Sequence, residues 1–398
     1  MRRKSNLSLA GGALVAAGLL LVAAGCGSST SSEEEVAPTE TVAVEETVEV
    51  DEVAAAQAIV DLYSVPPTEI AITVPLTGEV VTDRPVVFLQ CELPACQVLS
   101  DGVQSASEAM GWKFKNIAVT NTDPTTILSA LTEALKYNPI ATVVTGFPQP
   151  FWAEKIAEYE KAGSTIVPME VGLVEAMTPS VESIVDGVGK VSVIVKGAGG
   201  GTDSAARGAI VANYIIANSN AEAHVLIQDT PDYPVLSMMA IALKEEMAAK
   251  CSKCVVTSID STLPQVGAGE VGSSVVSGLQ KDRSIKWLAT SFLQFFDGIE
   301  VAMEAAGITD VKIVGSAPSV SNLQSVKDGK WEAATGATLG LKGWIVVDSI
   351  ARNLLGMEIP DVAIEPRMLF TKDNVIVSED MPFPADFQGQ FKTLWGRP

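Results

Sequence analysis

Short apolar runs alternate with amphipathic stretches from residue 84 to residue 378, and this alternation constrains the fold more strongly than any other feature of the chain. Apolar strands separated by helices are typical of parallel sheets that are covered by helices on both faces. The sequence therefore predicts an α/β protein. In the first half, strands are expected at 85–90, 113–119, 140–146 and 164–169, and helices at 94–111, 123–137 and 150–163.

The alternation breaks at the glycine-rich stretch VKGAGGGTDSAARG, residues 195–208, and then restarts. A phosphate-binding loop is one alternative, but the stretch lacks the Lys-Ser/Thr ending and the dinucleotide-binding spacing of glycines. We interpret it as a connection between two α/β lobes. In the second half, strands are expected at 223–229, 254–260, 286–292 and 310–316, helices at 203–218, 234–250, 271–281, 296–306, 319–328 and 341–355, and short strands near 367–377.

The first 26 residues have the features of an export signal. Arg2, Arg3 and Lys4 precede an apolar run at 7–24, and small residues stand directly before Cys26. This pattern resembles the lipobox of bacterial lipoproteins, which implies removal of residues 1–25 and a lipid anchor on the sulfur of Cys26. A transmembrane anchor is the alternative, although the run is barely long enough for a span and polar sequence follows at once.

The acidity of the chain is concentrated after this signal. The net charge is −21, and residues 33–52 hold nine acidic side chains and no basic one. We expect 26–83 to be an extended spacer, because like charges repel one another. The whole chain is 47% hydrophobic and only 19% charged, as in compact domains. No basic footprint for nucleic acid is present.

Four further cysteines occur as two close pairs. An even number of cysteines in an exported chain favours disulfides, and the spacing suggests one local bridge in each half. A zinc knuckle or a thioredoxin-like redox site is the alternative for CSKC at 251–254, although zinc would need two more ligands and the chain has one histidine. We predict disulfides between Cys91 and Cys96 and between Cys251 and Cys254.

Several longer phrases follow one another in a characteristic order. They are DGVQSASEAMGW at 101–112, NTDP at 121–124, ITDVKIVGSAPSVSNLQSVKDGKWEAATGA at 308–337, LKGWIVVDSIARNLLGMEIP at 341–360 and RMLFTKDNV at 367–375. With the order of the predicted elements, they resemble the type I substrate-binding proteins of bacterial ABC importers, in particular the ribose-binding-like branch. The resemblance covers residues 84–378.

The resemblance implies two Rossmann-like lobes with parallel sheets joined by a hinge, the periplasmic binding protein-like I fold. By analogy, the N-terminal lobe comprises 84–198 and 338–366, and the C-terminal lobe 199–337 and 367–398. A small-molecule ligand would lie in the cleft at the carboxyl ends of the strands, and the lobes would close on it. The implied protein is a monomeric solute-binding lipoprotein on the extracytoplasmic face of the cell membrane, whose partner is an ABC permease.

The predicted cleft residues are those that follow the strands. Aromatic side chains with a few polar groups suit a small-molecule pocket, because they combine desolvated area with hydrogen bonds that orient the ligand. Packing in the core is the alternative for each aromatic residue. The candidates are Gln90, Glu92, Asn121, Phe147, Gln149, Trp152, Glu170, Asp232, Tyr233, Phe292, Gln294, Phe295 and Ala317.

Departures from the sugar binders suggest a different ligand. Phe292 and Leu293 stand where those proteins usually have an Asn-Asp pair, Ala317 stands in place of an aspartate, and the segment 229–238 lacks their arginine. Such groups recognise vicinal hydroxyls through bidentate contacts, and without them each unpaired hydroxyl of a sugar would cost roughly 1–3 kcal/mol. We therefore expect a less hydroxylated, more apolar ligand. A true sugar-binding protein with an atypical pocket is the alternative.

Catalytic motifs are scarce. The single histidine, His224, begins an apolar strand, and neither a Gly-x-Ser-x-Gly elbow nor a His-Glu-x-x-His motif occurs. Carboxylates at strand ends could serve acid–base chemistry, but a binding site needs the same groups. We expect no enzyme activity, no cofactor and no metal. A lipoprotein receptor that reports its ligand to a membrane sensor is a second possible role, with the same binding physics.

Overall fold

The computed structural model describes residues 51–120, 123, 125–171, 193–194, 201–360, 366–378, 381 and 383–398, without the side chains of 201 and 202. The predicted signal peptide, Cys26 and most of the predicted spacer lie outside these residues, as does Asn121. The anchor and its lipidation therefore stay predictions. Among the helices of the described residues, none combines the length and the apolar character that crossing a membrane requires.

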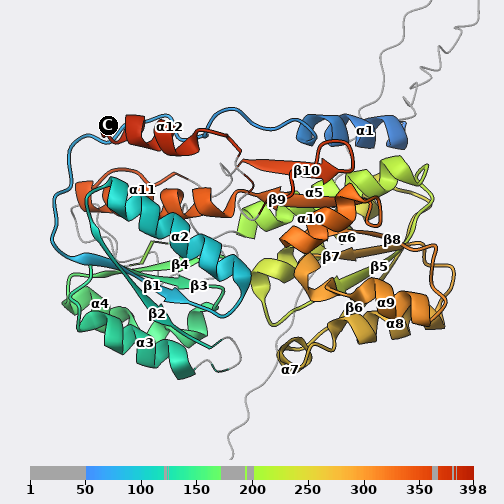
Figure 1. Cartoon of the computed structure of the whole chain (residues 1–398), viewed down its shortest axis with the longest axis horizontal. Helices are drawn as coiled ribbons and strands as arrows, with labels where there is room; N and C mark the ends of the chain where they lie inside the picture. The colour runs from blue at the N-terminus through green and yellow to red at the C-terminus, as the bar shows by residue number, and fades with distance from the viewer. Residues whose placement is uncertain are drawn as a thin grey trace, which may run out of the picture. The chain divides into compact units, whose positions relative to one another are not determined.

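The first lobe is built on a four-stranded sheet in the order β2-β1-β3-β4 (Figure 1). All of its strand pairs are parallel, as the sequence predicted. The strands β1 and β3 are buried along most or all of their length, which explains their continuous apolar sequence. The strands are β1 (Pro85–Gln90), β2 (Lys113–Ala118), β3 (Ala141–Thr145) and β4 (Thr165–Met169).

The second lobe has a six-stranded sheet in the order β10-β9-β8-β7-β5-β6. Its strands are parallel except for β10, which pairs antiparallel with β9 at the edge. Two parallel sheets in two lobes confirm the predicted fold class. The strands are β5 (His224–Asp229), β6 (Val255–Asp260), β7 (Trp287–Thr290), β8 (Lys312–Ser316), β9 (Ala333–Ala337) and β10 (Arg367–Thr371).

Most of the predicted helices form, and two are interrupted for local reasons. The stretch 150–163 is split into two 3₁₀ turns and a short helix, because the backbone of Trp152 has a non-helical φ of −137° and its ring packs into the core. The stretch 296–306 is broken at Gly298, because its φ of 78° is incompatible with a right-handed α-helix. The elements of the first lobe's helical layers are α2 (Pro94–Ala109), α3 (Thr125–Leu135), η1 (Gln149–Phe151), η2 (Ala153–Lys155), α4 (Ile156–Lys161) and α11 (Leu339–Leu355).

The helices of the second lobe follow the predicted ranges closely. Three of them, α6, α8 and α10, end within about one residue of the expected bounds, whereas the short α7 was not predicted. The elements are α5 (Gly201–Asn218), α6 (Pro234–Lys250), α7 (Leu263–Gly267), α8 (Val271–Lys281), η5 (Leu293–Phe296), α9 (Ile299–Ala305) and α10 (Val320–Lys327).

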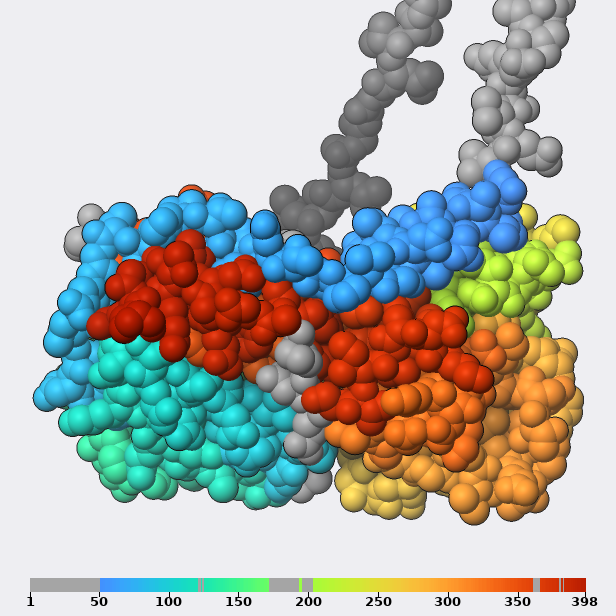
Figure 2. All heavy atoms as spheres, turned by 45° about the horizontal axis from the view of Figure 1, so that its top comes forward, coloured from blue at the N-terminus to red at the C-terminus, as the bar shows by residue number. Residues whose placement is uncertain are grey.

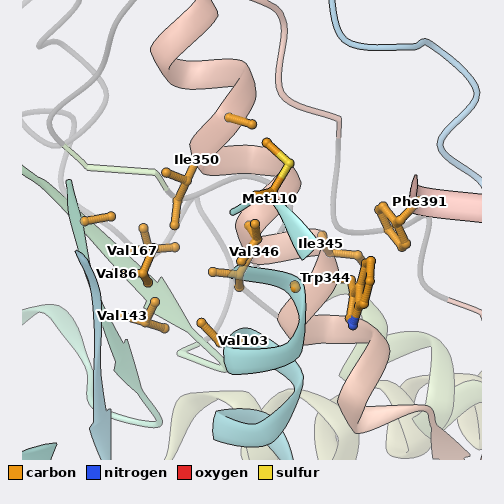
Figure 3. Close-up of a cluster of buried hydrophobic side chains, with 14 of the residues drawn as sticks. Val86, Val103, Met110, Val143, Val167, Trp344, Ile345, Val346, Ile350 and Phe391 are labelled. Atoms are coloured by element: carbon orange, nitrogen blue, oxygen red, sulfur yellow. The ribbon is translucent and has the colours of Figure 1, made fainter. Parts of the chain in front are cut away.

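The core of the first lobe lies between its sheet and the helices α2 and α11. Val346 and Ile350 of α11 face Val86 and Val167 of the sheet, as Figure 3 shows. The ring of Trp344 points away from the sheet, toward Phe391 at a centroid distance of 5.9 Å. Helix α11 is therefore buried on nearly all sides, and its polar residues, such as Lys342 and Arg352, are buried together with its apolar ones.

Both ends of the described chain correct the predicted boundaries. The expected spacer contains a helix, α1 (Glu52–Tyr63), which packs on α5 of the second lobe through Ala56 and Val60. The chain then crosses to the first lobe, where Ile70 joins the core. At the other end, α12 (Phe387–Leu394) packs in the first lobe and not in the second, because Phe387 and Phe391 contact Trp344. Figure 2 shows the N-terminal segment running across both lobes beside the C-terminal segment.

Candidate functional site

A cavity of about 410 Å³ lies where the carboxyl ends of strands from the two sheets face one another. Residues that follow β1, β3 and β4 line it from the first lobe, and residues that follow β5, β7 and β8 line it from the second. Open parallel sheets bind ligands at this edge, and the volume falls within the usual range for small-molecule sites. The cavity is therefore the candidate binding site.

Seven of the predicted cleft residues line this cavity. Three are aromatic residues of the second lobe, of which Phe292 and Phe295 lie 4.8 Å apart between ring centroids. The wall also includes aliphatic and sulfur-containing side chains, so apolar groups dominate it. The predicted residues on the wall are Glu92, Phe147, Glu170, Tyr233, Phe292, Phe295 and Ala317.

The other predicted residues within the described chain do not line the cavity. Trp152 is a core residue, fully buried, whose Nε1 donates a hydrogen bond to the carbonyl oxygen of Phe147 at 2.8 Å. Gln294 donates to the carbonyl oxygen of Ala317 at 3.3 Å, behind the wall. Asp232 accepts a hydrogen bond from the amide of Leu263 at 3.0 Å. Gln90 donates to Gln97 at 2.6 Å and accepts from Asn116, and Gln149 begins η1.

Three strand ends turn through the left-handed region at the cavity. Gly146 after β3 has φ 76°, which glycine adopts at little cost. Glu170 after β4 and Ala317 after β8 have φ 56° and φ 50°, and such values are uncommon for residues with a Cβ. Backbone strain of this kind is held in place by surrounding structure and clusters at ligand sites. Here the amide of Ala317 donates to the carbonyl oxygen of Thr335 at 3.1 Å.

A network of buried charges crosses between the lobes next to the cavity. Fully buried Asp203 on α5 has its Oδ2 2.9 Å from Nε of Arg207 and 3.5 Å from Nζ of Lys342 on α11. Its Oδ1 accepts a hydrogen bond from Nε of Arg367 at 3.0 Å. Lys342 also pairs with Glu170 at 2.5 Å. We call these five residues the Asp203 network.

The Asp203 network keeps its central carboxyl ionised. Burial alone raises the pKa of Asp203, because the charged form loses its hydration. The attraction of Arg207, Lys342 and Arg367 outweighs this effect and holds the pKa well below the usual aspartate range. Asp203 is therefore an anion at any pH at which the protein is folded in a cell, and it links cations from both lobes.

Tyr233 and Glu92 face the cavity from opposite lobes. Burial raises the pKa of the Tyr233 phenol, and the negative charges of Glu92 and Asp232 raise it further. The phenol is therefore protonated at neutral pH and can donate a hydrogen bond. With its apolar ring, Tyr233 can contact an apolar ligand and orient a polar group at the same time.

Both predicted disulfides are present, and only one is at the site. Cys91 and Cys96 line the cavity, and their bridge joins the end of β1 to the first turn of α2 with a Cα–Cα distance of 5.6 Å. Cys251 and Cys254 are bridged at the end of α6, away from the cavity wall. The first bridge therefore constrains the loop that presents Glu92 and Leu93 to the cavity.

Several residues of the cavity wall lie on helices. Because the residues predicted from the sequence were those that follow strands, these helical residues were not among them. They include Leu99 on α2, Met239 on α6, Leu339 on α11 and, on α5, Ser204 and Arg207. One signal was available for Arg207. It and Asp203 are the only charged residues in an otherwise weakly polar helix, and their spacing of four places them on one face.

The described residues hold no group of three or more His, Cys, Asp or Glu side chains arranged to bind a metal ion. The single histidine, His224, lies at the outer end of β5, where its Nδ1 is 2.8 Å from Oγ of Ser284. It is not on the cavity wall. The polar groups on the described cavity wall include Glu92, Glu170, Arg207 and Tyr233, together with hydroxyl groups of Ser204, Ser291 and Ser316.

Neither a protein-family model nor a curated protein sequence matches this chain. Solved structures do match its fold. An ABC sugar transporter subunit from Rhodobacter sphaeroides 2.4.1 superposes with a TM-score of 0.58 at 16% identity, over 73% of this chain and 99% of that chain. A 5-methylthioribose transporter solute-binding protein from Thermotoga lettingae TMO has a TM-score of 0.59 at 14% identity, over 82% of this chain and 96% of that chain.

The same fold also occurs in a different functional class. A putative LacI transcriptional regulator from Bacteroides fragilis superposes with a TM-score of 0.57 at 10% identity, over 74% of this chain and 98% of that chain. At such identities the likeness concerns the arrangement of the chain and not its ligand. The two sheets, the cavity at their facing edges and these superpositions agree: the chain has the type I fold of the solute-binding proteins of ABC transporters.

Proposed function

We propose that this protein is an extracytoplasmic solute-binding lipoprotein, which captures a small molecule between its lobes and delivers it to an ABC import permease. The observation that carries the proposal is the cavity of about 410 Å³ between the carboxyl ends of two parallel sheets. Several structures of this fold are named as ABC transporter solute-binding proteins, one of them with D-allose and one with D-arabinose. No enzymatic step is part of the proposal.

The chemistry of the wall supports a ligand with more apolar surface than a simple sugar. Phe147, Phe292, Phe295 and Met239 contribute surface that gains from excluding water but cannot pair with hydroxyl groups. Where the sugar binders usually carry an aspartate, Ala317 offers only a methyl group and its backbone. A sugar placed here would leave hydroxyls without partners, at a cost of roughly 1–3 kcal/mol for each buried group.

Ligand recovery is the direct test of the binding role. The protein is purified from its host without denaturation and examined by native mass spectrometry, and any bound molecule is released and identified. We expect a stoichiometric small molecule. The variant Phe295→Ala should retain less of it, whereas Tyr137→Ala, which removes an exposed aromatic ring outside the cavity, should retain as much as the unmodified protein. Absence of any ligand, together with no thermal shift across a broad metabolite library, would refute the role.

Anchoring and delivery are tested separately in cells. The variant Cys26→Ser should lose metabolic labelling by a radioactive fatty acid and leave the membrane fraction, because the sulfur that would carry the lipid is absent. A deletion strain should take up the recovered ligand more slowly than its parent. Normal uptake with loss of a transcriptional response to the ligand would instead indicate a receptor coupled to a membrane sensor.

A further inference from the structure

Arg207 is a buried cation on the wall of a mostly apolar cavity. It lies on α5, and its side chain is 7% exposed. A guanidinium in such a place is costly unless it is paired and hydrogen-bonded. Its partners therefore decide whether it serves only the fold or also the ligand.

The described residues satisfy only part of the hydrogen-bonding capacity of Arg207. Nε faces Oδ2 of Asp203 at 2.9 Å, Nη1 donates to Oγ of Ser316 at 3.0 Å and Nη2 donates to Oγ of Ser204 at 3.1 Å. A guanidinium has five N–H donors, so these contacts use one of the two donors on each terminal nitrogen. Among the described residues, one N–H on Nη1 and one on Nη2 have no partner, so they can serve a molecule in the cavity.

Two hydroxyl groups flank the guanidinium at the same wall. Ser204 and Ser316 both line the cavity and are almost completely buried, with exposed fractions of 3% and 1%. Because each Oγ accepts a hydrogen bond from Arg207, its own proton is free to be donated elsewhere. On the cavity side of the guanidinium, the wall thus offers two N–H groups and two hydroxyl protons, and such donors suit an anion.

We propose that the ligand is a monocarboxylic acid with an apolar ring or chain, whose carboxylate is bound by Arg207, Ser204 and Ser316. This inference rests on the proposed binding function and specifies its ligand class. The planar fork of arginine matches the two oxygens of a carboxylate, and charge-assisted hydrogen bonds of this kind are the strong ones. The apolar body would lie against Phe292, Phe295 and Met239.

The anionic groups of the wall are less suited to bind an amine. Glu170 is already paired with Lys342 at 2.5 Å, and Glu92 is exposed rather than enclosed. A ligand ammonium placed beside Ser204 and Ser316 would also face the guanidinium of Arg207, and like charges repel. A neutral ligand could pair with the two remaining N–H donors of Arg207 only through uncharged oxygens, which form weaker hydrogen bonds than a carboxylate does. A carboxylate supplies both the negative charge and two acceptor oxygens in the plane of the guanidinium.

The test uses matched probes that differ only in the polar group. Benzoate, phenylacetate and cyclohexanecarboxylate are each compared with the corresponding amide and amine by isothermal titration calorimetry, with glucose and ribose as polyols. At least one acid should bind more than tenfold more tightly than its amide, and the amines should bind more weakly still. In Arg207→Met the acid should lose this tenfold advantage, and Arg207→Lys should recover part of it.

Two further variants separate ligand binding from folding. Arg367→Met removes a cation that pairs with the same Asp203 but does not line the cavity, so it should lower stability and keep the acid–amide ratio. Ser316→Ala removes one hydroxyl and leaves the Asp203 network intact, so it should weaken acid binding severalfold even if Arg207→Met fails to fold.

The failures of the two proposals are distinguishable. Binding confined to a polyol, an amide or an amine, or acid binding that Arg207→Met and Ser316→Ala leave unchanged, overturns the carboxylate inference and keeps the binding role. An acid–amide ratio lost equally in Arg367→Met overturns direct contact by Arg207. If no probe binds, the carboxylate inference is overturned for these acids, and the native mass measurement decides the binding role independently.

Discussion

At the scale of single residues, the site is shaped by backbone conformations that side-chain identity does not reveal. Ala317 and Glu170 hold left-handed φ values at the ends of β8 and β4, and both line the cavity. A left-handed conformation costs a residue with a Cβ about 1–2 kcal/mol. The surrounding lobe provides this energy, so the strain at these two positions belongs to the construction of the binding wall.

The variant Ala317→Gly tests this strain. Glycine adopts φ 50° freely, and this relief is partly offset by the greater entropy of the unfolded chain. We expect a free energy of unfolding between unchanged and about 1 kcal/mol higher. Ala302→Gly, on an exposed position of α9, is the matched control and should lower stability by about 1 kcal/mol. Equal losses in urea denaturation of both variants would show that Ala317 is not strained.

The positions of residues directly after predicted strands identified part of the site. The types of the residues alone could not identify the rest. Phe147, Tyr233 and Phe295 follow strands and do line the cavity, because strand ends of a parallel sheet converge on one edge. Trp152 also follows a strand, but its ring turns inward to the core, and nothing in its identity distinguishes the two outcomes. Arg207 lies on a helix whose approach to the cavity depends on the packing of both lobes.

At the scale of elements, α2 and α11 make an unusually close contact. A Cβ on Gly343 would lie 2.3 Å from the backbone of Gly102 and Val103, and a Cβ on Gly102 would lie 2.4 Å from the carbonyl oxygen of Gly340. The two helices therefore approach until their backbones touch. Since the loop before α2 forms part of the cavity wall, this contact also sets the position of that wall.

The variant Gly343→Ala should disrupt this contact. A methyl group there has no space and would push the helices apart, with a loss of about 1–3 kcal/mol as is typical of overpacking. Gly272→Ala on α8 is the matched control, because its Cβ would meet Ile299 only at an ordinary 3.9 Å, and its stability should stay the same or rise slightly. Chemical denaturation compares the two, and an unperturbed Gly343→Ala would show that α2 and α11 can separate without cost.

The loop between β1 and α2 offers a second prediction. Replacing both Cys91 and Cys96 by serine should weaken ligand binding severalfold, because the loop that carries Glu92 and Leu93 would be ordered only on binding. The same double replacement at Cys251 and Cys254 should leave affinity unchanged, since that bridge is away from the cavity. Calorimetry with the recovered ligand distinguishes them, and an equal loss in both would contradict the assigned role of the loop.

Element types were predictable wherever tertiary packing agrees with local pattern. Helices α6 and α8 begin and end at the expected residues: Pro234 marks the first turn of α6, and α8 carries a clear apolar periodicity on one face. Helix α1 was missed, since its acidic setting suggested a spacer. Its N-cap Asp51 accepts hydrogen bonds from Val53 and Ala54, and burial of Ala56 and Val60 against the second lobe stabilises it. That burial depends on a surface formed more than 150 residues later in the chain.

At the scale of the whole molecule, the Asp203 network joins the two lobes by charge. Asp203, Arg207 and Arg367 belong to the second lobe, and Lys342 and Glu170 belong to the first. Removing one member of a buried charged cluster leaves its partners buried and unpaired, which typically costs 3–5 kcal/mol. The network should therefore contribute both to stability and to the relative placement of the lobes.

The variant Asp203→Asn should be destabilised by about 3–5 kcal/mol at neutral pH. Because the folded state lowers the pKa of Asp203, its contribution is complete above the unfolded value of about 3.9 and is lost as the pH falls below it. The difference between wild type and variant should therefore shrink between about pH 4 and pH 2. Asp310→Asn, which removes an exposed partner of Lys286, should leave the melting temperature nearly unchanged. A pH-independent difference would contradict the ionised state of Asp203.

The paths of the two chain ends bear on how far the lobes can separate. The described residues lie in different lobes before and after five points of the chain, which fall between 63 and 70, 194 and 201, 337 and 339, 355 and 367, and 383 and 387. Each connection between the lobes restricts their relative motion, so several connections together restrict it more than one does. We therefore expect the lobes to open through a narrow angle. They then lose less orientational entropy each time they close on a ligand. A small solute with few polar atoms can then hold the two halves shut.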